Sequence, residues 1–334
     1  MARVGHRPER VAVTATTPDE ADRSRWFTAM WLVVLGAVQF VALYEVIRLF
    51  VNRHHGQVLD TIALGGNWIG SDRVDGVVAT VLSAMSVVSV LAATCVVAFI
   101  ALARRRIAVG LAAIMLIAGS AITAQQLKDH LVRPNLGVDP ERAGAGNSLP
   151  SGHATVAASV AVALVLVLPP RARGVGALVG AGYAAVVGVA TMSAGWHRPS
   201  DSIAAFLIVG LWAAVAGLGL LITPQVGLLL RRQVSGRVVT AEPGESHRLA
   251  FVLLLAAGVA LLAAAILTME VTDQVAAPPE LLPYRRLFIA YAGAAVGIAG
   301  AAAVMMGLVL ATVHRVVPER TVVPESEPTA VDAS

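Results

Sequence analysis

Long apolar stretches separated by short polar segments make up most of the chain. A bilayer core requires about 20 consecutive apolar residues of helix, and eight stretches come close to that length. They are Trp26–Val51, Gly76–Ala103, Ile107–Leu127, Ala154–Leu168, Val175–Ala194, Ile203–Thr223, Leu249–Met269 and Phe288–Val313. Alanine and glycine are frequent in all of them, which favours close helix packing. The pattern predicts an all-α membrane protein with eight transmembrane helices.

Composition and charge agree with this prediction. Charged residues make up 14% of the chain, whereas soluble domains contain roughly 25%. The net charge is +4, but the arginines lie between apolar stretches and form no single patch, so a nucleic-acid partner is not indicated. Cys95 is the one cysteine, which excludes an internal disulfide and a cysteine-based metal site.

The positions of the arginines predict the orientation of the chain in the membrane. Clusters at residues 104–106, 171–173 and 231–237 would lie on one side of an eight-helix protein, together with both termini. The positive-inside rule places that side in the cytoplasm. Residues 1–25 and 318–334 lack apolar segments and are expected to be disordered tails there. Alanine, glycine and arginine are abundant and lysine is almost absent, which is typical of a high-GC bacterium, so the expected location is the plasma membrane.

Three polar segments on the opposite, extracytoplasmic side contain the candidate chemistry. The third stretch ends in Lys128–Pro134, the fourth begins after Pro150–His153, and the sixth begins after His197–Asp201. A helix N-terminus offers free N–H groups and a partial positive charge, so the Ser151-Gly152-His153 segment is typical of an anion site. Lys128, which is the one lysine of the chain, and Arg133 add fixed positive charge. The segments predict a phosphate site.

His197 and Asp201 have the spacing of a nucleophile and its orienting group. They are four residues apart at the start of a helix, where a carboxylate can accept the Nδ1–H of an imidazole and leave Nε2 to attack phosphorus. His153 is then the candidate general acid for the departing alkoxide. Taken singly, each motif is also compatible with a structural role.

Together, the three segments resemble the motifs of the type 2 phosphatidic acid phosphatase (PAP2) superfamily. Those motifs are Lys-x6-Arg-Pro, Pro-Ser-Gly-His and Ser-Arg-x5-His-x3-Asp, and the similarity extends over about Leu127–Phe206. The resemblance implies that His197 forms a phosphohistidine intermediate, that Asp201 orients it and that His153 is the acid. It also implies a reaction that needs no metal or other cofactor.

The same resemblance suggests how the chain is organised. It implies a six-helix transmembrane catalytic core at 26–223, followed by an extension at 224–317 with two further helices. Lys128, Ser151 and Gly152 match phosphate ligands of the family, and Arg133 is expected to join them.

Two departures from the family pattern concern arginines. The first motif is shortened to Lys-x4-Arg-Pro, so Asn135 stands where the family has its arginine. Thr191 stands six residues before His197, at the position of the third-motif arginine. Arg198 and Arg142 lie on the correct side to compensate.

The expected activity is therefore hydrolysis of a lipid phosphate or diphosphate. The expected partners of the protein are this lipid substrate and the bilayer itself. Polyprenyl (di)phosphates, phosphatidic acid and phosphatidylglycerol phosphate all fit. The alternatives are a lipid phosphotransferase and a non-catalytic lipid-phosphate binder or transporter that retains the fold. The main argument for the binder is that Thr191 replaces an arginine of the family pattern.

Two features near residue 60 fall outside these motifs. His54 and His55, with Asp60, have the residue types of a metal site, but adjacent histidines rarely bind one ion without further ligands, and a plain loop is expected. Alternatively, residues 58–70 form an interfacial helix near the mouth of the site.

Overall fold

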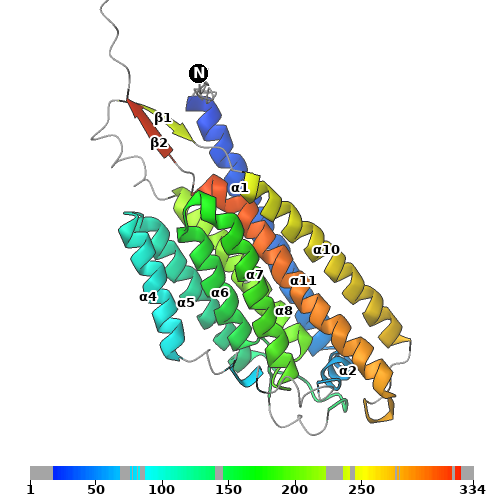
Figure 1. Cartoon of the computed structure of the whole chain (residues 1–334). Coiled ribbons are helices and arrows are strands. Elements are labelled where there is room, and N and C mark those ends of the chain that lie inside the picture. The colour runs from blue at the N-terminus through cyan, green and yellow to red at the C-terminus, as the bar shows by residue number, and fades with distance from the viewer. Residues whose placement is uncertain are drawn as a thin grey trace, which may run out of the picture.

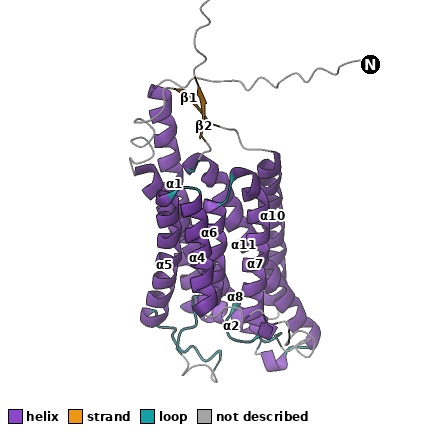
Figure 2. Ribbon diagram, turned by 60° about the vertical axis from the view of Figure 1, so that its left-hand side comes forward, coloured by secondary structure: helices purple, strands orange, loops and turns teal. Residues whose placement is uncertain are grey.

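The computed structural model describes residues 18–67, 76, 78–80, 82, 87–139, 146–222, 236–240, 245–274, 277, 279–317 and 320–324. These residues are almost entirely helical, and the helices run side by side as one elongated bundle (Figure 2). All eight apolar stretches predicted from the sequence contain a helix. The prediction of a membrane protein built from helices is therefore confirmed for the described part of the chain, apart from one short β-ribbon.

The bundle helices follow the apolar stretches closely. They are α1 (Pro18–Val46), α4 (Val87–Ala103), α5 (Ile107–His130), α6 (Gly152–Val167), α7 (Pro170–Ser193), α8 (Pro199–Ile222), α10 (Glu245–Asp273) and α11 (Tyr284–Val316). A π-helical segment, η1 (Ile47–Val51), continues α1. Among the described residues six helices are long and apolar enough to cross a membrane, whereas α4 and α6 are shorter apolar helices. The chain is therefore a multi-pass membrane protein.

Three elements differ from the expectations. The segment near residue 60 is a helix, α2 (His54–Leu64), which begins four residues before the predicted interfacial helix and is followed by a turn at 65–67. A two-stranded antiparallel ribbon joins β1 (Gly236–Thr240) to β2 (Arg320–Pro324), and β2 lies within the end expected to be a disordered tail. Helix α1 also begins eight residues before Trp26. A short 3₁₀ turn, η3 (Pro279–Leu281), precedes α11.

The last helix of the bundle is part of the main hydrophobic core. Ile298, Met306 and Leu310 of α11 are fully buried in one cluster with residues of α5, α6, α7 and α8. In Figure 1, α11 lies between α7 and α10, and α10 covers its outer side. The end of α11 is held by Arg173, which donates to the carbonyl of Val317 at 2.9 Å and to that of Leu168 at 3.1 Å. A cation is favourable at these two helix C-termini. Arg173 therefore stabilises the packing of the ends of α6 and α11 and also contributes to the positive charge of its loop.

The predicted polar segments gather at one end of the bundle. The C-terminus of α5, the N-termini of α6 and α8, and helix α2 lie at the end opposite the β-ribbon (Figure 1). The start of α1 and the end of α11 lie at the ribbon end, together with the arginine turn at 104–106. This arrangement separates the two sides as the sequence predicts, and residues 231 and 232 of the third arginine cluster lie outside the described residues.

Candidate active site

The start of α8 builds the centre of the site through its own capping interactions. Pro199 occupies the first helical position, where its missing N–H costs nothing. Asp201, two residues later, reaches back and accepts the backbone N–H of Arg198 through Oδ2 at 2.9 Å. This is the reciprocal half of a capping box, with a carboxylate at the third helical position. The local sequence therefore fixes the Asp201 carboxylate before any long-range contact is made.

The same carboxylate holds His197. Asp201 Oδ2 lies 3.2 Å from His197 Nδ1, and both side chains are buried, with 8% of His197 and 0% of Asp201 exposed. The Ser148 hydroxyl also hydrogen-bonds the Asp201 carboxylate. An ionised carboxylate can only accept, so Nδ1 carries the proton in this pair and Nε2 is the ring nitrogen not engaged by Asp201. The geometry is that of an oriented nucleophile or base.

The start of α6 lies directly against the start of α8. The backbone N–H of Ser151 donates to the carbonyl of Asp201 at 3.0 Å, and the Ser151 hydroxyl accepts from the N–H of Ala154 as the N-cap of α6. A side chain at Gly152 would meet no atom within 4 Å, so there is open space beside the first turn. The N–H groups of Gly152 and His153 make no backbone hydrogen bond within the described part of the chain, and N–H groups at a helix start suit an anion.

His153 and Lys128 flank this opening. The His153 ring packs at a tilt against Trp196, with 5.6 Å between centroids. Lys128, in the last turn of α5, and His197 both lie within electrostatic range of His153. The structure therefore brings Lys128, Ser151, Gly152, His153, His197 and Asp201 together from three helices.

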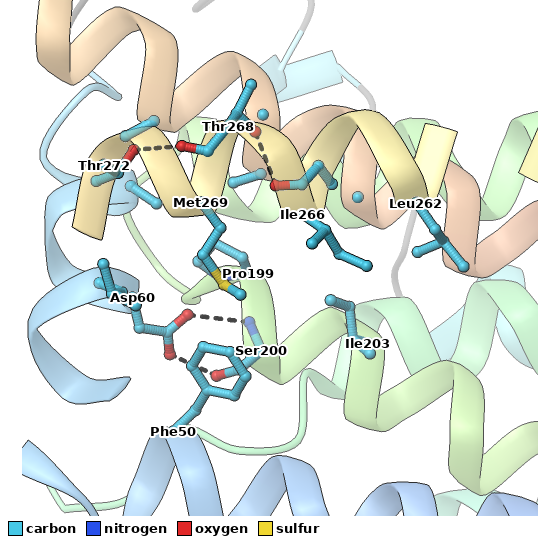
Figure 3. Close-up of a pocket in the computed structure, with 17 residues that line it drawn as sticks. Phe50, Asp60, Pro199, Ser200, Ile203, Leu262, Ile266, Thr268, Met269 and Thr272 are labelled. Carbon is cyan, nitrogen blue, oxygen red and sulfur yellow. Dashed lines mark hydrogen bonds between the residues drawn. The ribbon is translucent and has the colours of Figure 1, made fainter. Parts of the chain in front are cut away.

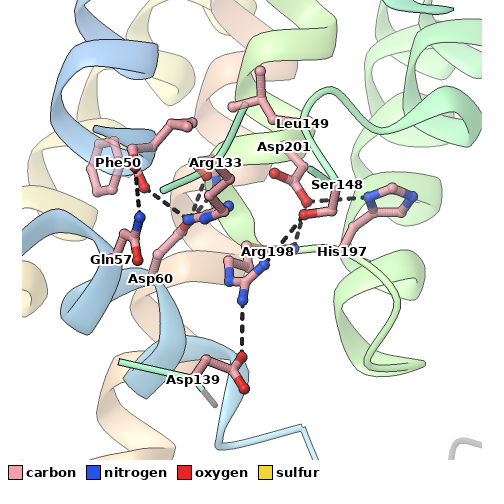
Figure 4. A network of polar contacts seen from close by, with 12 residues as sticks. Phe50, Gln57, Asp60, Arg133, Asp139, Ser148, Leu149, His197, Arg198 and Asp201 are labelled. Carbon is pink, nitrogen blue, oxygen red and sulfur yellow. Dashed lines mark hydrogen bonds and ion pairs between the residues drawn. The ribbon is translucent and has the colours of Figure 1, made fainter. Parts of the chain in front are cut away.

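Two buried guanidiniums complete the polar network (Figure 4). Arg198 donates to Asp139 at 2.9 Å and to the Ser148 hydroxyl at 3.3 Å. Arg133 donates to the carbonyl of Phe50 at 2.8 Å and lies 3.6 Å from Asp60. Arg133 Nη1 and Arg198 Nε are buried and have no hydrogen-bond partner among the described residues. Buried donors without a partner are uncommon, and an anion bound beside the two guanidiniums would supply acceptors for them.

Asp60 is the site residue that sequence reasoning assigned differently. Its carboxylate accepts the backbone N–H and the hydroxyl of Ser200, so α2 is fastened to the first turn of α8. Burial, helped by the negative charge of Asp201, raises the pKa of Asp60 from 3.8 to about 6, although Arg133 and Ser200 oppose the rise. Burial and the positive charge of Arg198 lower the pKa of Arg133. Both groups therefore have pKa values shifted from their ordinary ones, which is typical of functional sites.

Two of the candidate metal ligands near residue 60, His55 and Asp60, contact different partners in the structure. His55 Nε2 pairs with Asp273 of α10 at 2.6 Å, whereas Asp60 points inward to Ser200. No group of three or more histidine, cysteine, aspartate or glutamate residues that could hold a metal ion occurs in the described part of the chain. The sequence contains one indication of the role of Asp60. Asp60 is the one carboxylate in the apolar segment Val58–Leu64, and a carboxylate buried in such a segment requires a polar partner.

Among the described residues, the side chains at the two family departures make only local hydrogen bonds. Asn135 accepts the N–H of Gly137 at 3.0 Å, within its own turn. Thr191 is fully buried, and its hydroxyl donates to the carbonyl of Gly188 in the preceding turn of α7. Its carbonyl accepts the N–H groups of Trp196 and His197 and so ends α7. Arg142 lies outside the described residues, which leaves Arg198 as the described arginine nearest to His197.

Comparison with known proteins gives one match. Residues 120–218 match the model of the PAP2 superfamily, a segment that runs from the middle of α5 through nearly all of α8. It contains Lys128, Arg133, the start of α6 and the His197–Asp201 pair. No curated protein and no solved structure matches the chain.

Proposed function

From the PAP2 superfamily domain at residues 120–218, we propose that this membrane protein is a phosphatase that hydrolyses a lipid phosphate or diphosphate through a phosphohistidine. The observation that carries the proposal is the buried His197–Asp201 pair, with a 3.2 Å hydrogen bond, beside two guanidiniums with unsatisfied donors. A nucleophile, its orienting group and an anion site are the parts that phosphoryl transfer requires.

In the first step, Nε2 of His197 attacks phosphorus as the bond to the lipid oxygen breaks. Asp201 accepts the Nδ1–H bond throughout, and this stabilises the positive charge that develops on the imidazole. His153 donates a proton to the departing oxygen, so that a neutral alcohol or a protonated phosphate leaves. In the second step, a water molecule attacks the phosphohistidine and gives a proton to the now unprotonated His153 as the bond between nitrogen and phosphorus breaks, which releases inorganic phosphate and restores the lone pair of His197.

Positive groups around the phosphoryl oxygens supply the stabilisation. We assign Lys128, Arg198 and the N-terminus of α6 to the phosphoryl oxygens, where charge would build up in the transition state. We assign to Arg198 the role of the third-motif arginine that Thr191 replaces, because its Nε is a buried donor without a partner. Arg133 supports the same oxygens from the side of α2.

The binder alternative also has an observation in its favour. Both guanidiniums are partly neutralised by carboxylates, Arg133 by Asp60 and Arg198 by Asp139, which weakens the field that catalysis requires. The arrangement of His153 opposite an oriented His197 favours the enzyme, because a binder needs neither an acid nor a fixed imidazole tautomer.

The proposal is tested by phosphate release in detergent with excess EDTA, from a panel of lipid mono- and diphosphates. The wild type is compared with His197→Ala and with His130→Ala, an exposed histidine that contacts the carbonyl of Gln126 in its own helix. We expect EDTA-resistant release by the wild type and His130→Ala and none by His197→Ala. Release by His197→Ala would refute the nucleophile, and binding without release by the wild type would favour the binder.

A further inference from the structure

A cavity of about 170 Å³ lies between α2, α8, α10 and α11 (Figure 3). Its walls are apolar side chains, among them Ile203 of α8, Leu262, Ile266 and Met269 of α10, and Ala290 and Ala294 of α11. The α10 residues that line it run from Leu262 to Thr272, which corresponds to about 15 Å along a helix axis. The cavity is therefore elongated parallel to the bundle.

The polar groups in its wall are already bonded elsewhere. The hydroxyls of Thr268 and Thr272 donate at 2.8 Å to carbonyls of their own helix. The two oxygens of the Asp60 carboxylate accept hydrogen bonds from the backbone N–H and the hydroxyl of Ser200, as Figure 3 also shows. An apolar cavity without free hydrogen-bonding groups stays dry and accepts hydrocarbon.

One end of the cavity adjoins the candidate active site. Phe50 and Asp60 line the cavity, and the same two residues contact Arg133. Pro199 and Ser200, which also line it, directly follow His197 and Arg198. A ligand with a phosphate at Arg133 and Arg198 can therefore extend into the cavity from its headgroup.

The side of the cavity formed by α10 is open to the surroundings of the bundle. Ile266 is 57% exposed and Met269 is 40% exposed, although both line the cavity. Helix α10 packs on the outside of α11 and α7, where a membrane-spanning helix meets lipid. A chain can enter sideways between α10 and α8 without crossing the headgroup layer.

We propose that this cavity binds one hydrocarbon chain of the substrate lipid and that α10 and α11, outside the matched PAP2 segment, set the chain selectivity. The proposal rests on the phosphatase function proposed above. It commits to the substrate's own chain because the cavity shares Phe50 and Asp60 with the phosphate site, which a bound structural lipid would not require.

The test compares two substrates with the same phosphomonoester group, phosphatidic acid with long chains in mixed micelles and glycerol 3-phosphate without chains. Met269→Trp fills the cavity from its exposed side. The matched control is Leu267→Trp, a 66% exposed residue of α10 that does not line the cavity. The measured quantity is the ratio of kcat/KM for the long-chain to the chainless substrate.

We expect Met269→Trp to lower this ratio about tenfold or more, which corresponds to about 1.4 kcal/mol, at the lower end of overpacking costs. Leu267→Trp should leave it unchanged. An equal ratio in wild type and Met269→Trp would overturn the chain assignment while phosphate release itself stands. If Met269→Trp loses both activities through misfolding, Ile266→Trp takes its place with the same criterion. Absence of phosphate release by the wild type from every lipid mono- and diphosphate of the panel described above would instead refute the phosphatase.

Discussion

Replacing Asp60 by asparagine should stabilise the protein at alkaline pH. The Asp60 carboxylate is buried beneath the start of α8, and its pKa is raised from 3.8 to about 6. Asparagine has nearly the shape of the protonated acid, keeps one oxygen for Ser200 and never ionises. The substitution therefore removes the free-energy cost of a buried negative charge. It also removes the charge that lies 3.6 Å from Arg133.

The magnitude and sign follow from the pKa difference. Below pH 3.8 the carboxyl is neutral in the folded and the unfolded protein, and the wild type and the variant should be equally stable. Between pH 3.8 and about 6 the unfolded chain ionises while the folded carboxyl stays protonated, so the wild type loses stability over this range and loses no more above it. A rise of about two units corresponds to roughly 3 kcal/mol at pH 8.

The assay is unfolding of the purified protein in detergent at pH 5 and pH 8. Asp60→Asn should exceed the wild type in stability at pH 8, and this advantage should shrink at pH 5. The control is Asp129→Asn, an exposed carboxylate on α5 that accepts from Gln125, which should show no such divergence. An Asp60→Asn variant less stable than wild type at pH 8 would show that the pairing with Arg133 outweighs burial.

Two further predictions concern the catalytic groups. Asp201→Asn keeps an acceptor for the Arg198 N–H but disturbs the His197 tautomer, so kcat should fall by about 10³-fold or more with the fold retained; a rate within tenfold of wild type would contradict the orienting role. Arg198→Ala removes charged hydrogen bonds worth about 1.5–3 kcal/mol, so kcat/KM should fall roughly 10- to 100-fold. Arg285→Ala, an exposed arginine of α11, is its control, and equal loss in both would refute a specific phosphate contact.

The helices and the central pair were predictable because their causes are local. The length of an apolar run determines whether a helix can cross a bilayer, and each of the eight runs contains a helix. The His197–Asp201 hydrogen bond depends on two residues in one turn, with Pro199 between them to start the helix. The catalytic roles of both residues remain predictions.

Other parts of the site depend on contacts between distant segments. Asp60 reaches Ser200 across 140 positions, and Arg198 reaches Asp139 across 59. No local pattern specifies such pairs, because a lone carboxylate in an apolar segment indicates that a partner is needed and not which one it is.

By itself, the sequence determined the membrane fold, the end of the bundle at which the chemistry gathers and the motifs of the PAP2 domain. Only the tertiary structure decided that α11 joins the main core, that Arg198 and Arg133 are buried with donors to spare, and that α10 and α11 enclose an apolar cavity beside them. The physical reason is that helix formation follows from residues a few positions apart, whereas cavities and buried charge networks follow from how helices pack.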